Sequence, residues 1–154
     1  MCMILREIYR SIYLEDFVYE NLEDRIKLQK AVYLLENMGL NVGDYSFSWA
    51  KYGPYSPHLD GDARFCMTKK PGKVHFSEQA NKAFTKVKDM LEIPHDPYST
   101  RYWIEDIASI HFLRNVCHYS EEKALSVLVK QKKYLNNRSL NTQAAQLANM
   151  ISLS

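Results

Sequence analysis

The sequence has little glycine or proline and no long uninterrupted apolar run. Five glycines and five prolines in 154 residues exclude a collagen-like or low-complexity chain, and 46% hydrophobic residues is a globular composition. The longer apolar runs, such as 107–113, are interrupted by Ser109 and His111, and fall far short of the roughly 20 residues that a membrane-spanning helix needs. We therefore expect a folded chain that does not cross a membrane.

Cysteine is also scarce, and its spacing excludes the common cysteine-based sites. Cys2, Cys66 and Cys117 are odd in number, and no pair has the two-residue separation of zinc or redox motifs. The simplest interpretation is three reduced thiols in a reducing compartment. The N-terminus carries Arg6 and Arg10 but neither a long apolar stretch nor a small-residue cleavage site, so it does not resemble a secretory signal. We expect a cytoplasmic protein.

The net charge is small but unevenly distributed. A formal charge of +2 does not by itself indicate nucleic-acid binding. The first 24 residues hold six acidic side chains against two arginines, whereas the chain from Lys123 onward holds five basic side chains and no acid. This basic stripe could neutralise phosphates, and a solvated helix face explains it equally well. The candidate nucleic-acid contacts are Lys123, Lys130, Lys132, Lys133 and Arg138.

Helical periodicity covers most of the chain. One helix begins after the N-cap Asn21 and ends at Gly39, which suits a left-handed C-terminal residue. Pro57 suits the first position of another helix, and Ser77 suits the cap of the next. The predicted helices cover 3–14, 22–38, 57–66, 77–91, 100–116, 121–135 and 141–151.

Two short segments have extended patterns. In 44–52, aromatic residues alternate with small ones until Gly53-Pro54 ends the strand. The segment 73–76 follows a Lys-Lys-Pro-Gly turn and can pair as a second short strand. The sequence therefore predicts a mainly α fold, a compact single-domain helical bundle of about six helices over residues 1–154 with a small β-hairpin or wing.

Residues that carry chemistry do not gather into a recognisable site. Five histidines are scattered through the chain, and no carboxylate recurs near them at a metal-ligand spacing. Asp60-Gly61-Asp62 resembles the start of a calcium loop but lacks the ligands that should follow. We expect no catalytic residue, metal or cofactor, and an enzyme that acts through a histidine or cysteine is the weakest of three functional hypotheses.

Aromatic residues are concentrated around one Gly-Pro turn. Five of them lie within eleven positions: Tyr45, Phe47, Trp49, Tyr52 and Tyr55. Such a stiff amphipathic segment suits either the core or an anchor for a protein interface, and both interpretations stay open.

Two sequence blocks resemble a known family. The block 27–35, KLQKAVYLL, is followed about fifteen residues later by 49–57, WAKYGPYSP. Both resemble the signature of the SocA-like antitoxin superfamily, also called the Panacea domain, and its YwgA-type branch most of all. The segment 107–113 is similar to a later helix of that family, and the resemblance spans roughly 22–130. It implies a largely helical, non-enzymatic domain that neutralises toxins or acts as an interaction module in toxin–antitoxin, phage-linked or defence loci.

A physical interpretation connects the two blocks. We expect the lysines of the first block and Gln29 to line the accessible edge of their helix. Gly53 allows a positive φ or a close approach of the backbone, and Pro54 fixes the turn that follows. Together these residues could hold the aromatic segment against the helix. The predicted partner-binding residues are Lys27, Gln29, Lys30, Tyr33, Trp49, Tyr52, Gly53, Pro54 and Tyr55.

The expected partner is a protein, either a toxin or a component of a defence or anti-defence system. A homodimer is left open, and no membrane contact is expected. The alternative is a small DNA-binding transcriptional regulator in which 73–76 forms a winged-helix-like element beside the basic stripe.

Overall fold

Seven helices and one two-stranded hairpin make up the described part of the chain, which in this computed structural model is residues 2–151, with side chains from residue 4 onward. This agrees with the predicted mainly helical fold. The helices are α1 (Cys2–Tyr13), α2 (Leu22–Asn37), α3 (Pro57–Cys66), α4 (Glu78–Glu92), α5 (Thr100–Asn115), α6 (Glu121–Gln131) and α7 (Arg138–Ile151). The strands are β1 (Ser48–Ala50) and β2 (Gly53–Tyr55).

Polar side chains set where five of the helices begin. Each accepts a hydrogen bond from a backbone N–H in the first turn, where the helix itself leaves the amides without partners. Loss of one such cap typically costs about 1 kcal/mol. The caps are Asn21 for α2, Ser56 for α3, Ser77 for α4, Ser99 for α5 and Ser120 for α6.

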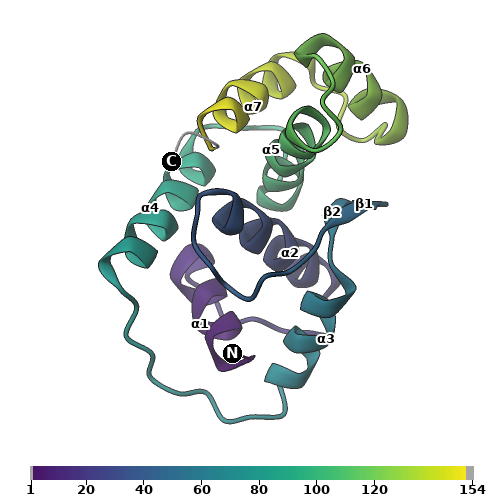
Figure 1. Cartoon of the computed structure of the whole chain (residues 1–154). Coiled ribbons are helices and arrows are strands. Elements are labelled where there is room, and N and C mark those ends of the chain that lie inside the picture. The colour runs from purple at the N-terminus through teal and green to yellow at the C-terminus, as the bar shows by residue number, and fades with distance from the viewer. Residues whose placement is uncertain (1, 152–154) are drawn as a thin grey trace.

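Helices α2 and α5 form the centre of the molecule. Both are buried around most of their circumference, and they pack against one another (Figure 1). Around α2 lie α1, α3 and α4, while α6 and α7 cover α5 at the other end of the molecule. The hairpin lies at the edge where α2 meets α5, and β2 contacts both helices.

The predicted wing is wrong. The segment 73–76 forms no strand, and its Phe76 ring instead packs edge-on against Phe84, with 4.8 Å between ring centroids. This ring contact and a hydrogen bond from the Asn81 side chain to the Phe76 carbonyl oxygen attach the connection to α4 without a ladder of backbone hydrogen bonds. The hairpin lies earlier in the chain than this wing, because Gly53 and Pro54 belong to a second strand that pairs antiparallel with the first, Ala50 opposite Gly53 and Trp49 opposite Pro54.

Two helix boundaries near the C-terminus also differ from the prediction. Helix α6 ends at Gln131, not at 135, because Lys132 leaves the helical conformation with φ −126° and ψ 75°. Helix α7 begins at Arg138, three residues before the predicted start, and Asn137 accepts a hydrogen bond from the Leu140 N–H at 3.0 Å. Among residues 2–151, no helix has the length and apolar character needed to span a membrane.

Candidate functional site

Two polar side chains of α2 hold the backbone of the second strand. The Gln29 amide donates to the Ser56 carbonyl oxygen and accepts from the Ser56 N–H, both at 2.9 Å. The Lys30 ammonium donates to the Pro54 carbonyl oxygen at 2.9 Å. Gln29 is 3% exposed and Lys30 is 1% exposed. Because buried backbone groups without partners are costly, these bonds fix the hairpin on α2.

The prediction for Gly53 was a positive φ or a close approach of the backbone, and the structure has both. Its φ of +94° lies in the region that glycine tolerates best. A Cβ at this position would lie 2.4 Å from the Ser109 hydroxyl oxygen and 3.5 Å from Cε of Lys30. The strand therefore approaches α5 too closely for any side chain at Gly53.

A buried ion cluster joins α5 to the chain around the hairpin. Its centre is Glu105, which is completely buried. One carboxylate oxygen lies 3.2 Å from Nε of Arg101, and the other lies 3.6 Å from the Lys132 ammonium. The Tyr134 hydroxyl donates a hydrogen bond to the same carboxylate. Burial raises the pKa of Glu105, whereas these partners lower it.

Lys132 connects this cluster to the hairpin. Its ammonium donates to the carbonyl oxygen of Ala50 at 3.3 Å and to that of Lys51. It also lies 4.8 Å from the centre of the Trp49 ring. The indole N–H of Trp49 donates to the Gln131 side chain at 2.6 Å. The turn between the two strands is thus held from the α6 side as well.

Positive charge exceeds negative charge in this interior. The residues that carry it are Lys30, Arg101 and Lys132, while the acidic residues are Glu105 and Asp106. Burial, reinforced by the neighbouring Glu105, raises the pKa of Asp106 well above its ordinary value and so favours its neutral form. Among the described residues, neither Asp106 oxygen has a hydrogen-bond partner. Within residues 2–151, Glu105 is then the one buried carboxylate left to balance the basic side chains Lys30, Arg101 and Lys132.

Lys30 is the least compensated of these cations. Within residues 2–151, no carboxylate lies within ion-pairing distance of its ammonium. Burial lowers the pKa of Lys30 to about 7; Glu105 opposes this shift, and the charges of Lys132 and Arg101 add to it. The amine therefore changes charge near neutral pH.

Lys30 also lines a cleft of about 450 Å³ between the N-terminal half of α2 and the hairpin. Aromatic, basic and aliphatic side chains line the cleft together with one acid. Arg25 donates to the Tyr19 carbonyl oxygen at 2.9 Å, and Tyr19 donates to Asp60 at 2.9 Å, so this wall is held in place. The aromatic and basic residues are Tyr19, Arg25, Lys30, Lys51, Tyr52 and Tyr55, and the others are Leu22, Ile26, Gln29, Ala50 and Asp60.

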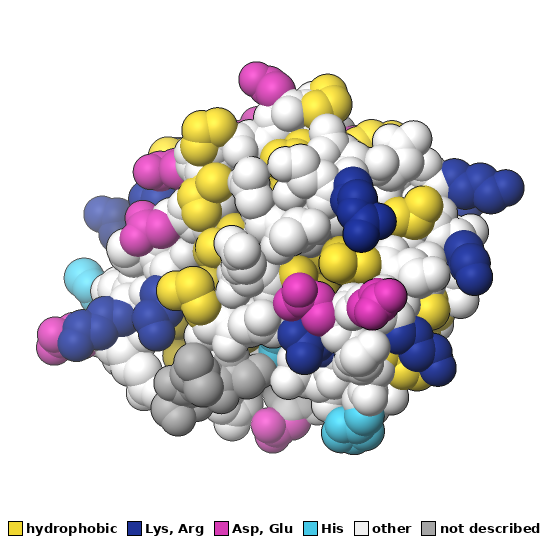
Figure 2. All heavy atoms as spheres, turned by 90° about the horizontal axis from the view of Figure 1, so that it is seen from above, with side chains coloured by type: hydrophobic (Ala, Val, Ile, Leu, Met, Phe, Trp, Pro, Cys, Tyr) yellow, Lys and Arg dark blue, Asp and Glu magenta, His cyan; other side chains and the backbone are white. Residues whose placement is uncertain are grey.

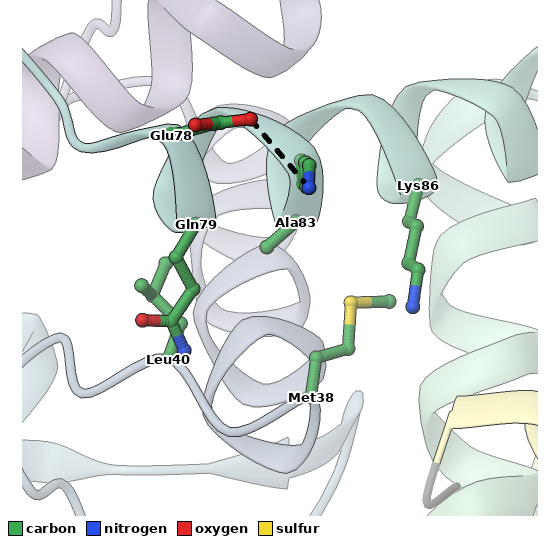
Figure 3. A pocket seen from close by; sticks show the side chains of 7 residues that line it. Met38, Leu40, Glu78, Gln79, Ala83 and Lys86 are labelled. Carbon is green, nitrogen blue, oxygen red and sulfur yellow. Dashed lines mark ion pairs between the residues drawn. The ribbon is translucent and has the colours of Figure 1, made fainter. Parts of the chain in front are cut away.

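A second hollow of about 390 Å³ lies between the end of α2 and α4 (Figure 3). Figure 3 shows Met38 and Leu40 on one side and the side chains of α4 on the other. Its charged side chains are exposed, and Lys82 lies 3.6 Å from Glu78 of the same helix. This hollow lacks the buried, uncompensated charge of the cleft.

The predicted partner-binding residues of α2 are placed differently from expectation. The accessible edge predicted for Gln29 and Lys30 is wrong, because both are buried and reach the cleft only from its floor. Lys27 is mostly covered, with a side chain 12% exposed that pairs with Glu15 at 3.2 Å. Tyr33 is buried, and its hydroxyl lies 2.7 Å from Nδ1 of His111. Since neighbours surround α2, it has no free polar face.

The predicted residues of the second block fall into two groups. Gly53 and Pro54 are buried and serve the fold. Trp49, Tyr52 and Tyr55 are half-buried. Tyr52 and Tyr55 line the cleft, and the Arg101 guanidinium lies 4.8 Å from the centre of the Tyr52 ring. The cleft thus brings together Gln29, Lys30, Tyr52 and Tyr55 from the predicted set.

Lys132, one of the five residues of the predicted basic stripe, does not belong to an exposed face. Lys132 is 2% exposed and bound to the hairpin, so it is not part of a solvated helix face. The other four side chains are exposed. On the face that carries α6 and α7, basic side chains are separated by apolar and acidic ones (Figure 2).

Histidine and cysteine do not form a site in the structure. His111 is buried, and burial lowers its pKa to about 4. Cys66 is buried in the core, Cys117 is half-buried, and the Cys2 side chain lies outside the described residues. In residues 2–151, no group of three or more His, Cys, Asp or Glu side chains could hold a metal ion.

The ion cluster was not predicted from the sequence. Arg101 and Glu105 are spaced one helical turn apart, and this spacing was the available signal. Comparison of the chain with protein-family models, with curated proteins and with solved structures finds no match.

Proposed function

We propose that this chain is a cytoplasmic, non-enzymatic protein-binding module, an antitoxin-like or inhibitor protein that docks its partner in the cleft. The observation that carries the proposal is the fixed hairpin, whose backbone is bound by buried Gln29 and Lys30 and which displays Tyr52 and Tyr55 beside the cleft. Aromatic residues held in one conformation bind partners with little loss of entropy, and tyrosine is enriched at interface hot spots.

The family resemblance supports the same proposal. The blocks KLQK and YGP, which resemble the SocA-like superfamily, are the segments that contact one another through Lys30 and Pro54. In a domain of that superfamily, this contact between the helix and the hairpin would hold the docking surface rigid. The antitoxin-like role and the toxin, defence or anti-defence partner are proposed on this resemblance.

Co-expression with the products of the adjacent genes tests the function directly. A tagged form of this chain should co-purify with one of them, and it should restore growth if that product is toxic. Tyr52→Ala and Tyr55→Ala should each weaken the purified complex about ten-fold or more, as expected of hot-spot tyrosines. Tyr119→Ala is the matched control, because Tyr119 is also half-buried but does not line the cleft.

Two outcomes would overturn the proposal. One is that no adjacent gene product binds. The other is that both cleft variants bind as tightly as the unchanged chain.

The DNA-binding alternative has less structural support. Its predicted wing at 73–76 forms no strand, and Lys132 is buried. Four exposed basic residues of the stripe remain. A mobility-shift assay at two salt concentrations tests this alternative, since phosphate-driven affinity falls steeply as salt rises. No shift at low salt would remove it.

A further inference from the structure

Lys30, a buried lysine that lines the cleft, has fewer hydrogen-bond partners than its ammonium group can use. An ammonium group has three N–H donors, and Lys30 has one hydrogen bond, to the Pro54 carbonyl oxygen. A buried charge is stable only when it is paired and hydrogen-bonded. Glu105, the carboxylate that influences Lys30, is already occupied by Arg101, Lys132 and Tyr134.

The walls of the cleft add charge of the same sign. Arg25 and Lys51 both line it, and the Lys51 ammonium lies 5.4 Å from the centre of the Tyr52 ring. The acidic residue in the lining, Asp60, accepts a hydrogen bond from Tyr19. An occupant of this cleft would therefore meet three basic side chains against one engaged carboxylate, with tyrosine rings beside them.

We infer that the cleft binds a carboxylate of the partner protein, with Lys30 beneath it, Arg25 and Lys51 at its sides, and Tyr52 and Tyr55 against the neighbouring apolar group. This inference rests on the proposed function and identifies what the partner inserts. The entering carboxylate supplies the negative charge that the buried lysine lacks, and the tyrosines favour an apolar or aromatic residue next to it.

Protonation of Lys30 should govern the strength of this binding. Its pKa of about 7 means that the free protein holds the amine partly neutral at neutral pH. The groups that face it are Glu105 and Arg101 of α5 and Lys132 beyond α6, with Lys51 in the hairpin turn. A carboxylate binds the protonated form, so its affinity should fall as pH rises through about 7.

Three matched dipeptides test the inference without the partner. Acetyl-Phe-Asp-amide carries a side-chain carboxylate, acetyl-Phe-Ala carries a C-terminal carboxylate, and acetyl-Phe-Ala-amide carries neither. Calorimetry at pH 6 should give at least one charged dipeptide a Kd about ten-fold or more below that of the neutral one. Amide chemical-shift changes should concentrate in 25–30 and 51–55. The charged dipeptide that binds better identifies the source of the carboxylate.

Three results would overturn the inference. The first is that the neutral dipeptide binds as tightly as the charged ones, and the second is that none of the three binds. The third is that inorganic phosphate binds more tightly than either carboxylate. Affinity that stays constant between pH 6 and pH 8 would remove Lys30 from the site.

Substitutions of the basic side chains show which positive charges bind the carboxylate. Lys30→Met should abolish the preference for the charged dipeptides, and circular dichroism shows whether the fold survives loss of the bond to Pro54. The double variant Arg25→Gln/Lys51→Gln removes the two charges at the sides of the cleft and should weaken binding several-fold; circular dichroism checks that loss of the bond from Arg25 to Tyr19 leaves the fold intact. Lys86→Met, in the hollow drawn in Figure 3, is the matched control and should leave binding unchanged. Equal binding by the double variant and the unchanged protein would count against the inference.

This experiment separates two kinds of failure. If a partner binds and is lost in Tyr52→Ala while the dipeptides show no preference for charge, the proposed function stands and the carboxylate site fails. If the charged dipeptides bind as expected but no adjacent gene product does, the carboxylate site stands and the antitoxin-like function fails.

Discussion

The two ends of α2 differ in how tightly the glycines and lysines near them are packed. Two glycines with a positive φ lie close to this helix: Gly39 directly after its C-cap Met38, and Gly53 in the hairpin that packs on it. A hollow lined by lysine adjoins each end of the helix. A Cβ on Gly39 would have open space, whereas one on Gly53 would collide with Ser109. Lys82 is exposed beside Glu78, while Lys30 is buried without such a partner. Burial, more than residue type, sets what each position can tolerate.

The largest expected effect comes from the glutamine that holds the hairpin. Gln29→Met leaves the Ser56 N–H and carbonyl oxygen buried without their partner. At about 1–3 kcal/mol for each group, we expect the free energy of unfolding to fall by about 4 kcal/mol. Urea denaturation measures the change. Gln79→Met, in the exposed hollow at the other end of α2, should change the free energy of unfolding by less than about 0.5 kcal/mol. Equal changes in the two variants would contradict the role of Gln29 in holding the hairpin.

The two glycines provide the second test. Gly53→Ala should destabilise the protein by about 3 kcal/mol, since it combines backbone strain with a clash. Gly39→Ala should cost only the strain, about 1 kcal/mol. Adding Ser109→Ala to Gly53→Ala removes the nearest clashing atom and should recover part of the loss. Equal losses for the two glycine variants would show that space at Gly53 is not limiting.

The third test uses the pH dependence of stability. The unfolded pKa of Lys30 is 10.5 and its folded pKa is about 7, so between these values the unfolded chain binds the extra proton. Stability should therefore rise with pH in this window, and at pH 7 the folded state is penalised. From pH 7 to pH 9 the contribution of Lys30 should be about 2 kcal/mol. Denaturation of Lys30→Met at both pH values should lack this rise, while Lys86→Met should keep it.

The smallest expected effect is at the exposed ion pair. Lys82→Gln removes a partner of Glu78, and both side chains are largely in water. Exposed pairs at this helical spacing contribute about 0.3–0.5 kcal/mol, and salt screens them. The measured change in Tm should be close to the experimental error and should vanish at high salt. A loss above about 1 kcal/mol would mean that this hollow is more constrained than its exposure indicates.

The helices and their caps could be predicted because their signals are local. Asn21 accepts from the backbone amides of its own helix, and Gly39 follows the C-terminus of α2, so a few neighbouring residues contain the necessary information. Gly53 was also predicted, since a glycine before a proline indicates either an unusual φ or a close approach. Here both are present.

The rest depends on contacts between distant segments. The KLQK block by itself does not indicate that the hairpin will pack over Gln29 and Lys30, so these side chains were expected to be accessible and are instead buried. Lys132 was assigned to a helix face because the helix was expected to continue, and its early end turns the ammonium toward the hairpin. Four alternating residues at 73–76 did not distinguish a paired strand from a connection that packs by one ring.

The contacts of Ser56 fix the relative positions of α2, β2 and α3. Its backbone is bound to α2, its hydroxyl accepts from the Leu59 N–H at 3.2 Å to begin α3, and it directly follows β2. One additional residue between Gly53 and Pro57 would move Ser56 out of register with Gln29, or break the hydrogen bonds between them. The exposed connection 68–76 has no comparable anchor, so insertions and fluorescent tags should be accepted there and refused at the serine.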